Sequence, residues 1–305
     1  MPSQILVVGS SNTDMVVKAD KLPAPGETVI GGTFLMNPGG KGANQAVAIA
    51  RLIEPLAGGS ITFVAKVGND IFGRQALSGF EREGINTSYI LTDADNPSGV
   101  ALINVDASGE NCITVAPGSN ANLQPIETEA ALQAANSDAL VLLQLEIPLP
   151  TVEYVIRKAA ERGLRVILNP APAQPLPADL FSNLFLITPN ETEAELLTGI
   201  RVTDLPTAQQ AAQKFHDMGV MNVVITLGSK GAYLHTSENR GQLIDAPLVK
   251  AIDTTAAGDC FNGALTVALS EGKTLPDAVA FACQAASISV TRMGAQASVP
   301  YRNEF

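Results

Sequence analysis

The sequence has 305 residues, 46% of them hydrophobic, which is enough for one large α/β domain with an appendage or for two ordinary domains. Acidic residues outnumber Lys and Arg by 30 to 19, giving a formal charge of −11 without a basic run, so neither nucleic acid nor an anionic membrane is an expected partner. The first residues lack the pattern of a signal peptide, no apolar stretch is long enough to span a bilayer, and the three cysteines have no metal-like or redox spacing, which together predict a cytoplasmic protein.

Apolar runs of strand length alternate along the chain with segments of helical periodicity. The expected strands are Ile5–Val8, Ile61–Val67, Ala139–Leu145, Arg165–Asn169, Leu184–Thr188 and Val223–Leu227. The expected helices lie near 42–53, 70–83, 150–162, 190–198, 206–218, 257–271 and 276–290. Because the strands are continuously hydrophobic rather than alternating, they predict a mostly parallel sheet that is covered by helices on both faces.

Two regions, about 14–37 and 97–116, break this alternation. Pro-Gly and Ser-Gly-Glu turn signals there separate short, half-polar strands, expected at Met15–Lys18, Val29–Gly31, Val100–Val105 and Cys112–Ala116. These strands suit a small antiparallel layer that projects from the main sheet, and a pair of edge hairpins is the alternative.

A glycine-rich stretch, Asn37–Ala46, begins the first expected helix. It is not a Walker A loop, because the four-residue spacer and the Lys-Ser/Thr ending are absent. Close backbone approach, with Asn44 one turn into the helix, suits the recognition of sugar hydroxyls better than that of phosphate. Ordinary turn chemistry is the alternative.

Polar residues follow several of the expected strands, at the sheet edge where open parallel sheets bind their ligands. Asn12 and Asp14 come after the first strand, and Glu146 comes after the strand ending at Leu145. Asn190 and Glu193 follow a later strand, although they could also form a capped, acidic first turn of a helix. The stretch 228–231, after Val223–Leu227, is interpreted as a turn, and contact with nucleotide phosphates is its functional alternative.

The segment Asp253–Ala264 carries the strongest chemical signal. Small residues at 256–258 let the backbone approach a ligand, and the amides of a helix N-terminus then face outward as anion donors. Phosphoryl transfer to an alcohol needs such donors together with an acceptor for the hydroxyl proton, which Asp259 supplies. A helix N-terminus is expected to keep Asp259 ionised at neutral pH. The alternative for Asp259 is a helix N-cap.

The two histidines, His216 and His235, each lack a second histidine or cysteine at ligand spacing. We interpret them as helix-face or strand-surface residues. A general base must then be a carboxylate or a lysine.

The two glycine motifs, Gly39–Gln45 and Asp253–Asp259, together with their order and separation, resemble the signatures of the ribokinase-like (PfkB-type) carbohydrate kinases. The resemblance extends from Gly9 to about Pro300. It implies one kinase domain over 1–305, a three-layer α/β/α sandwich with a mostly parallel central sheet and a small antiparallel β lid. The implied reaction is transfer of the γ-phosphoryl group of ATP to the primary 5-hydroxyl of D-ribose, which yields ribose 5-phosphate and ADP.

The resemblance also implies roles for individual residues. Asp259 matches the catalytic base, and the anion hole matches the amides of Ala256, Ala257 and Gly258. The positions that match sugar-hydroxyl ligands are Asn12, Asp14, Gly40, Lys41, Asn44 and Glu146. The positions that match the ATP site are Asn190, Glu193, Thr226, Gly228, Ser229, Gly231, Gly258 and, near the adenine, Cys283.

Two metal ions and a dimer are further implications of the resemblance. Glu193 matches a residue that organises Mg²⁺ through water. The loops that surround an activating monovalent cation, usually K⁺, match Asp253, Thr255, Ser289, Arg292, Gly294 and Ser298, largely through main-chain oxygens. The lid closes over the sugar in this family and often joins two subunits.

The sequence departs from the family at two cysteines. Cys260 stands where Thr or Ser is usual, and Cys283 where His is frequent. Both are interpreted as small buried residues, and an oxidation-sensitive Cys260 is the alternative.

Two other functions compete with the sugar kinase. A sugar sensor that had lost catalysis would show an eroded anion hole or base, and the segment Ala256–Asp259 is complete. A nucleoside kinase would need an aromatic wall, and aromatic residues make up only 5% of the chain.

Overall fold

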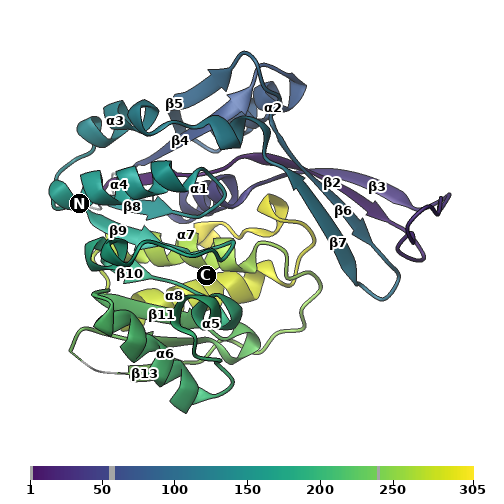
Figure 1. Ribbon diagram of the computed structural model, residues 1–305. Helices are drawn as coiled ribbons and strands as arrows, with labels where there is room; N and C mark the ends of the chain where they lie inside the picture. The colour runs from purple at the N-terminus through teal and green to yellow at the C-terminus, as the bar shows by residue number, and fades with distance from the viewer. Residues whose placement is uncertain (1–2, 55–58, 239–240) are drawn as a thin grey trace.

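The computed structural model describes residues 3–54, 59–238 and 241–305, and a nine-stranded sheet forms its centre (Figure 1). The strand order is β13-β12-β11-β10-β9-β8-β1-β4-β5. The strands are β1 (Ile5–Val8), β4 (Ile61–Gly68), β5 (Asn86–Asp93), β8 (Leu140–Leu143), β9 (Arg165–Leu168), β10 (Leu186–Ile187), β11 (Asn222–Thr226), β12 (Ala232–His235) and β13 (Gly241–Ile244). Each buried strand expected from the sequence is therefore present.

The sheet is mostly parallel, as the continuous hydrophobic runs predict. The strands from β11 to β5 pair in parallel, with Ile5 opposite both Ile61 and Leu140, whereas β12 runs antiparallel to its two neighbours. The sequence did not predict β5, β12 or β13, which lie at or next to the sheet edges. There the runs are shorter or more polar, since an edge strand need not be apolar on both faces.

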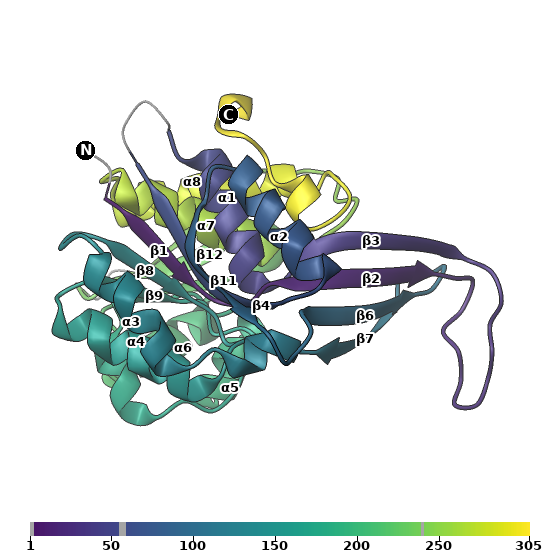
Figure 2. The same cartoon turned by 90° about the horizontal axis from the view of Figure 1, so that it is seen from above.

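Helices cover both faces of this sheet and complete three layers (Figure 2). One face carries α1 (Lys41–Leu52), α2 (Ile71–Arg82), α7 (Ala257–Ser270) and α8 (Leu275–Ser289). The other carries α3 (Pro125–Ala134), α4 (Leu149–Glu161), α5 (Glu191–Thr198) and α6 (Leu205–Asp217). Short 3-10 turns occupy Gly118–Asn122, Ala178–Asn183, Gly228–Lys230, Gln296–Ser298 and Arg302–Glu304. None of the helices within the described ranges is both long and apolar enough to cross a membrane.

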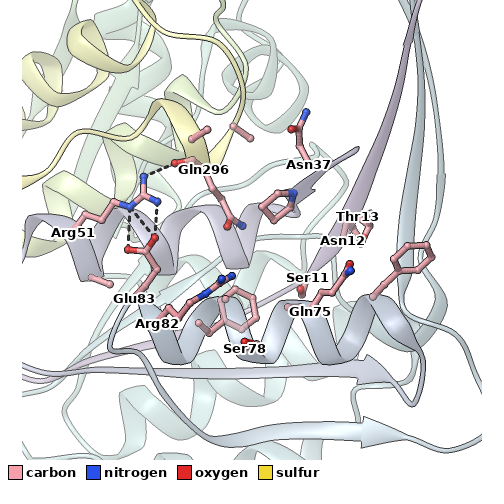
Figure 3. A pocket seen from close by; sticks show the side chains of 18 of the residues that line it. Ser11, Asn12, Thr13, Asn37, Arg51, Gln75, Ser78, Arg82, Glu83 and Gln296 are labelled. Atoms are coloured by element: carbon pink, nitrogen blue, oxygen red, sulfur yellow. Dashed lines mark hydrogen bonds and ion pairs between the residues drawn. The ribbon is translucent and has the colours of Figure 1, made fainter. Parts of the chain in front are cut away.

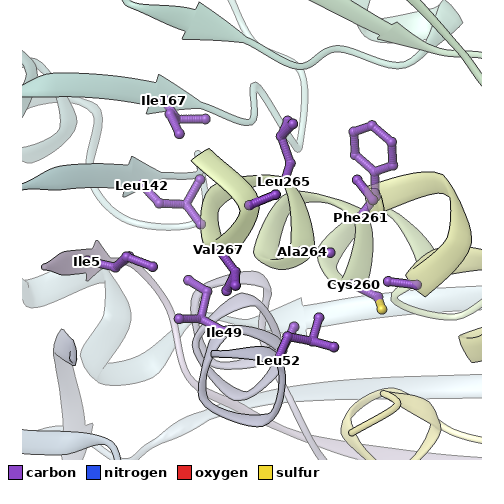
Figure 4. Close-up of a cluster of buried hydrophobic side chains, with 14 of the residues drawn as sticks. Ile5, Ile49, Leu52, Leu142, Ile167, Cys260, Phe261, Ala264, Leu265 and Val267 are labelled. Atoms are coloured by element: carbon purple, nitrogen blue, oxygen red, sulfur yellow. The ribbon is translucent and has the colours of Figure 1, made fainter. Parts of the chain in front are cut away.

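The alternation of side chains along β1 divides the core between the two faces. Ile5 and Val7 join the cluster under α1 and α7, whereas Leu6 and Val8 join the cluster under α3 and α4. In Figure 4, Ile49 and Leu52 of α1 lie against the apolar side of α7. This packing holds the two helices that begin at the two glycine motifs side by side.

A second sheet, the lid, projects from one end of the sandwich (Figure 2). Its order is β3-β2-β6-β7, with β2 (Asn12–Lys18), β3 (Thr33–Gly39), β6 (Gly99–Val105) and β7 (Asn111–Ala116). The lid is thus one sheet rather than two separate hairpins. Its hairpins are antiparallel, but the central pair β2–β6 is parallel, with Asn12 opposite Gly99.

The strand expected at Val29–Gly31 was wrong: those residues form no strand, and β3 begins at Thr33. Gly31 and Gly32 have φ values of 119° and 97°, a backbone region that favours glycine and interrupts a regular strand.

The two histidines differ in burial. His216 lies half-buried on α6, as expected, and its Nδ1 is 2.8 Å from the carbonyl oxygen of Val220. His235 on β12 is 1% exposed, so its expected place on a strand surface was wrong. The reason is that α6 covers β12 and places the two imidazole rings 4.9 Å apart.

Candidate active site

Asp259 lies in the first turn of α7, but it does not cap the helix. The N-cap is Ala256, and the Asp259 carboxylate instead points across to α1. There Oδ2 accepts a hydrogen bond from Asn44 Nδ2 and Oδ1 accepts one from Gln45 Nε2, both at 2.9 Å. The N-cap alternative for Asp259 is therefore wrong, and the carboxylate belongs to a cluster shared by both glycine motifs.

The backbone before α7 is open to solvent on one side. Ala256 adopts a left-handed conformation (φ 57°), which is unusual for a residue with a side chain and turns the chain sharply into the helix. The N–H groups of Ala256 and Gly258 make no hydrogen bond within the described residues, whereas that of Ala257 donates to the Thr254 carbonyl at 3.2 Å. Gly258 is exposed, and no atom lies within 4 Å of where its Cβ would stand. An anion can reach this helix start.

Asn262 fixes the start of α7 through two side-chain hydrogen bonds. Its Nδ2 donates to the Gly258 carbonyl at 2.8 Å, and its Oδ1 accepts from Thr188 Oγ1 at 2.6 Å. The helix start is thus fixed to the end of β10.

Burial raises the pKa of Asp259, and Lys41 and the amide donors of Asn44 and Gln45 oppose that rise. The sequence-based expectation was that the helix N-terminus would keep this carboxyl ionised at neutral pH. In the structure, desolvation is the largest influence, because the side chain is only 6% exposed. A pKa moved upward toward neutrality suits a group that must accept a proton.

The expected sugar-binding residues come together between the lid and the main sheet. Asn12 and Asp14 lie on β2, Lys41 and Asn44 on α1, and Glu146 after β8. The Glu146 carboxylate joins two of these segments, since its Oε2 accepts from Ser10 Oγ at 2.6 Å and from the Lys41 amide at 3.0 Å.

The pKa of Asp14 is also raised. Burial, together with the charges of Glu146 and Asp259, raises its pKa to about 6, and Lys41 opposes the rise. The pKa of Lys41 is itself raised by these carboxylates despite its burial. Three acids and one lysine therefore face the same space.

Gly40 lets α1 begin close to β2. Its φ is 89°, and an added Cβ would lie 2.7 Å from the Asn12 amide nitrogen. Any other residue there would separate the helix from the strand that carries Asn12 and Asp14.

Asn190 and Glu193 form a capping box at the start of α5, as the structural alternative predicted. Asn190 Oδ1 accepts from the Glu193 amide at 2.8 Å, and Glu193 Oε2 accepts from the Asn190 amide at 2.9 Å. Glu193 is more than a cap residue, however, because charges on other helices also act on it. Burial raises the pKa of its carboxyl, the charge of Lys41 lowers it, and the charge of Asp259 raises it. The Glu193 carboxylate is therefore close enough to Lys41 and to the base for their charges to act on it.

The remaining expected nucleotide residues lie farther along the same sheet edge. Thr226, at the end of β11, bridges to Asn190, and the 3-10 turn from Gly228 to Lys230 follows it. Ser229 is on this turn, and Gly231 ends it with a φ of 97°.

Cys260 and Cys283 are both buried. Burial raises the pKa of Cys260 to about 12 and that of Cys283 to about 11. Neither thiol is poised to form a thiolate, which favours their interpretation as small packing residues.

The residues expected around a monovalent cation form two loops that are joined to each other. The Asp253 carboxylate accepts from the Thr255 amide at 2.9 Å and from the Gly294 amide at 2.8 Å. Ser289 and Ser298 donate their hydroxyls to nearby carbonyls, and Arg292 pairs with Glu304. These side chains are already engaged, so the loops present mainly carbonyl oxygens.

Sequence reasoning missed several residues that position the site. Gln45 donates to Asp259 and also to Asn169 Oδ1 at 3.0 Å, while Gln144 donates to Gln45 Oε1 at 2.6 Å. Asn120 holds Asn12 through a 2.8 Å bond. Of these residues, only Gln45 could have been suspected from the sequence, because it follows Asn44 in the first glycine motif.

Comparisons with known proteins agree with this fold. The family model described as pfkB family carbohydrate kinase matches residues 2–302, so the chain belongs to that family. Among its relatives, a ribokinase of Haemophilus influenzae is 45% identical over 100% of this chain and 97% of the relative. A deoxyribokinase of Salmonella typhi is 36% identical over 99% of this chain and 97% of the relative. The solved structure of Arabidopsis thaliana ribokinase complexed with ribose and ATP matches with a TM-score of 0.89 at 33% identity, covering 99% of this chain and 97% of that one.

Proposed function

We propose that this protein transfers the γ-phosphoryl group of ATP to the primary 5-hydroxyl of D-ribose, forming ribose 5-phosphate and ADP. The observation that carries the proposal is the position of Asp259, a buried carboxylate at an open helix N-terminus, joined to the polar cluster through Asn44. The ribokinase relatives and the relative solved with ribose and ATP support the choice of substrates.

In the proposed mechanism, five side chains bind the sugar hydroxyls, and the backbone of Gly40 lies close by. The five are Asn12, Asp14, Lys41, Asn44 and Glu146. This set offers both charged acceptors and donors, which suits a small polyol. Binding orients the primary hydroxyl toward Asp259.

Asp259 accepts the proton of that hydroxyl as phosphoryl transfer proceeds. The amides of Ala256, Ala257 and Gly258 stabilise the transferring oxygens, and the Ala257 N–H must leave the Thr254 carbonyl to take part. The transition state of such a transfer is loose, so the base need not be strong. We expect lid closure to exclude water that would otherwise hydrolyse ATP.

The nucleotide site is proposed to be lined by seven of the residues expected from the sequence: Asn190, Glu193, Thr226, Gly228, Ser229, Gly231 and Cys283. Glu193 fits a role near Mg²⁺, because one carboxylate oxygen serves the helix cap while Oε1 makes no hydrogen bond within the described residues. Mg²⁺ keeps several waters and commonly meets a protein through one or two carboxylates. The ion would neutralise charge on the ATP phosphates.

K⁺ fits the two joined loops for a different reason. Their side chains already make hydrogen bonds or ion pairs, so these residues would contribute through their backbone or by shaping the loops. They are Asp253, Thr255, Ser289, Arg292, Gly294 and Ser298. Since the Asp253 loop leads directly into the anion-binding turn, an ion held there would stabilise that turn.

The lid is proposed to join two copies of this chain. Strand β7 of the lid exposes apolar side chains: Ile113 is 53% exposed and Val115 is 49% exposed. Large exposed apolar surfaces of this kind mark interaction sites.

The test of the proposed function is an assay of ATP consumption with D-ribose, 2-deoxy-D-ribose and nucleosides, each with and without K⁺. We expect D-ribose to give the highest kcat/KM and K⁺ to raise the rate. A higher kcat/KM for deoxyribose or a nucleoside would replace ribose as the substrate, and no ATP consumption with any acceptor would contradict the kinase itself.

A further inference from the structure

A cavity of about 1380 Å³ lies beside the candidate active site and shares Asn12 with it (Figure 3). Its walls are the base of the lid, the end of α1, the length of α2 and the C-terminal segment from 295 to 303. Neither Asp259 nor Glu193 lines it. The cavity therefore meets the candidate sugar site at Asn12 without reaching the base, and we call it the arginine cavity.

The charge of this cavity is opposite to that of the molecule. Although the chain has a net charge of −11, the described residues that line the cavity include four arginines and one acid, Glu83. The arginines are Arg51, Arg74, Arg82 and Arg302. A concentration of one sign of charge in a concave surface attracts ligands of the other sign.

Two of the arginines already have structural partners. Arg51 Nε lies 3.1 and 3.0 Å from the two oxygens of Glu83, and its Nη1 donates to the Gln296 carbonyl at 2.6 Å. Arg302 bonds to Glu271 at 2.9 Å. The Arg51 pair neutralises the only acid of the cavity, at one end of the space shown in Figure 3.

The other two arginines are exposed and unpaired. Within the described residues, Arg74 and Arg82 make no side-chain hydrogen bond and no ion pair. They are spaced with Ser78 at intervals of four residues, so all three lie on one face of α2. Two uncompensated guanidinium groups and a hydroxyl thus border the same cavity.

A buried donor points to a ligand independently. Gln296 lines the cavity with only 8% of its surface exposed, and its Nε2 has no hydrogen-bond partner among the described residues. A buried N–H without an acceptor is unfavourable. The Nε2 atom is closed off from the cavity in this conformation, so a ligand oxygen can accept from it only when the Gln296 side chain turns toward the cavity.

We propose that the arginine cavity binds an organic phosphate, held by Arg74 and Arg82 with Gln296 and Ser78 as neutral donors. Guanidinium groups match phosphate oxygens with paired N–H donors. The volume exceeds what a lone inorganic ion would fill, which favours a phosphorylated metabolite. This proposal does not depend on the identity of the sugar that the active site phosphorylates.

The test must separate this cavity from the phosphate-binding sites of catalysis. The full-length protein is first saturated with a non-hydrolysable ATP analogue, Mg²⁺ and ribose, and ribose 5-phosphate or pyrophosphate is then titrated by calorimetry. We expect saturable binding that weakens at least about tenfold in the double variant Arg74→Gln/Arg82→Gln, because two charge-assisted contacts are lost. The variant Lys214→Gln, which removes an exposed charge on α6, is the matched control and binds as the wild type does.

Two results would overturn the proposal. One is no binding to the saturated protein, or binding that the double variant leaves within twofold while its melting temperature is unchanged. The other is equal binding of sulfate at the same ionic strength, which would indicate a general anion site only. Neither arginine has a side-chain hydrogen bond or ion pair within 3–54, 59–238 and 241–305, so the double variant is expected to fold normally.

Discussion

At the scale of single residues, the carboxylate of Asp259 combines burial with specific support. Burial raises its pKa, while two amide side chains fix the positions of both oxygens. A carboxylate held in this way is positioned for proton transfer without being paired permanently to a cation. Its removal should therefore affect chemistry more than binding.

We predict that Asp259→Asn lowers kcat by roughly 10²–10⁴-fold while the dissociation constant for ribose changes little, because the amide keeps the shape but cannot accept the proton. Calorimetric sugar binding and steady-state turnover measure the two quantities separately. Turnover equal to that of the wild type would remove Asp259 from the role of base.

Asp14 predicts a pH dependence of sugar binding. Its pKa is raised to about 6, so its carboxylate loses its charge as the pH falls through that value. If the charged form binds the hydroxyls, the dissociation constant for ribose should increase below pH 6, approaching about tenfold per pH unit. Asp14→Asn should bind more weakly and lack this dependence, and a variant that kept the wild-type pH profile would assign the titration to another group.

At the scale of elements, the contact between α1 and α7 builds the site. Asn44 and Gln45 on α1 reach Asp259 on α7 because Gly263 allows the helices to pack closely; an added Cβ would lie 2.5 Å from Ala48 Cβ. The same contact contributes to the apolar core drawn in Figure 4. Core packing and catalytic geometry are therefore coupled.

We predict that Gly263→Ala destabilises the fold by about 1–3 kcal/mol, as overpacked cores do, and also lowers kcat by separating the two helices. Thermal unfolding and turnover are the measurements. Gly79→Ala on α2 is the matched control, since its Cβ would meet nothing nearer than 4.0 Å and alanine favours a helix by about 0.5–1 kcal/mol. Equal stability of the two variants would contradict the close approach.

At the scale of the whole molecule, the buried His235 makes stability depend on pH. Burial and the neighbouring His216 lower the pKa of His235 below its usual 6.5. As the pH falls below 6.5, the unfolded chain takes up this proton before the folded chain does, so the free energy of unfolding decreases down to the folded-state pKa.

We predict that wild-type stability falls between pH 6.5 and 5 more steeply than that of His235→Gln, which cannot ionise. Denaturant unfolding at several pH values gives the two slopes. The raised carboxyl pKa values of Asp14 and Glu193 act in the opposite direction in both proteins, so the difference between the slopes isolates the histidine. Identical slopes would contradict the assignment.

The lid determines the proposed assembly. Ile113→Asp places a charge on the apolar face of β7 and should convert a dimer into monomers, as measured by sedimentation equilibrium. Ile126→Asp, at a 69% exposed position on α3, is the control and should leave the mass unchanged. A wild type that is already monomeric at high concentration would rule out the lid dimer.

The sequence alone determined the features that depend on local pattern. The buried strands could be predicted because a strand covered on both faces needs continuous apolar residues, and the two glycine motifs because close backbone approach requires small residues. The motifs also indicated Asp259 and Asn44 as parts of one site. The edge strands and α3 carried weaker patterns and were not predicted.

Only the tertiary structure decided how distant segments meet. The hydrogen bond from Asn44 to Asp259 joins residues separated by 215 positions, and the parallel β2–β6 pair turns two hairpins into one lid. The burial of His235 and the gathering of Arg74 and Arg82 around one cavity follow from packing between elements as well. Local propensity depends on neighbours in the chain, whereas burial, pKa and charge depend on neighbours in space, which the order of residues does not specify directly.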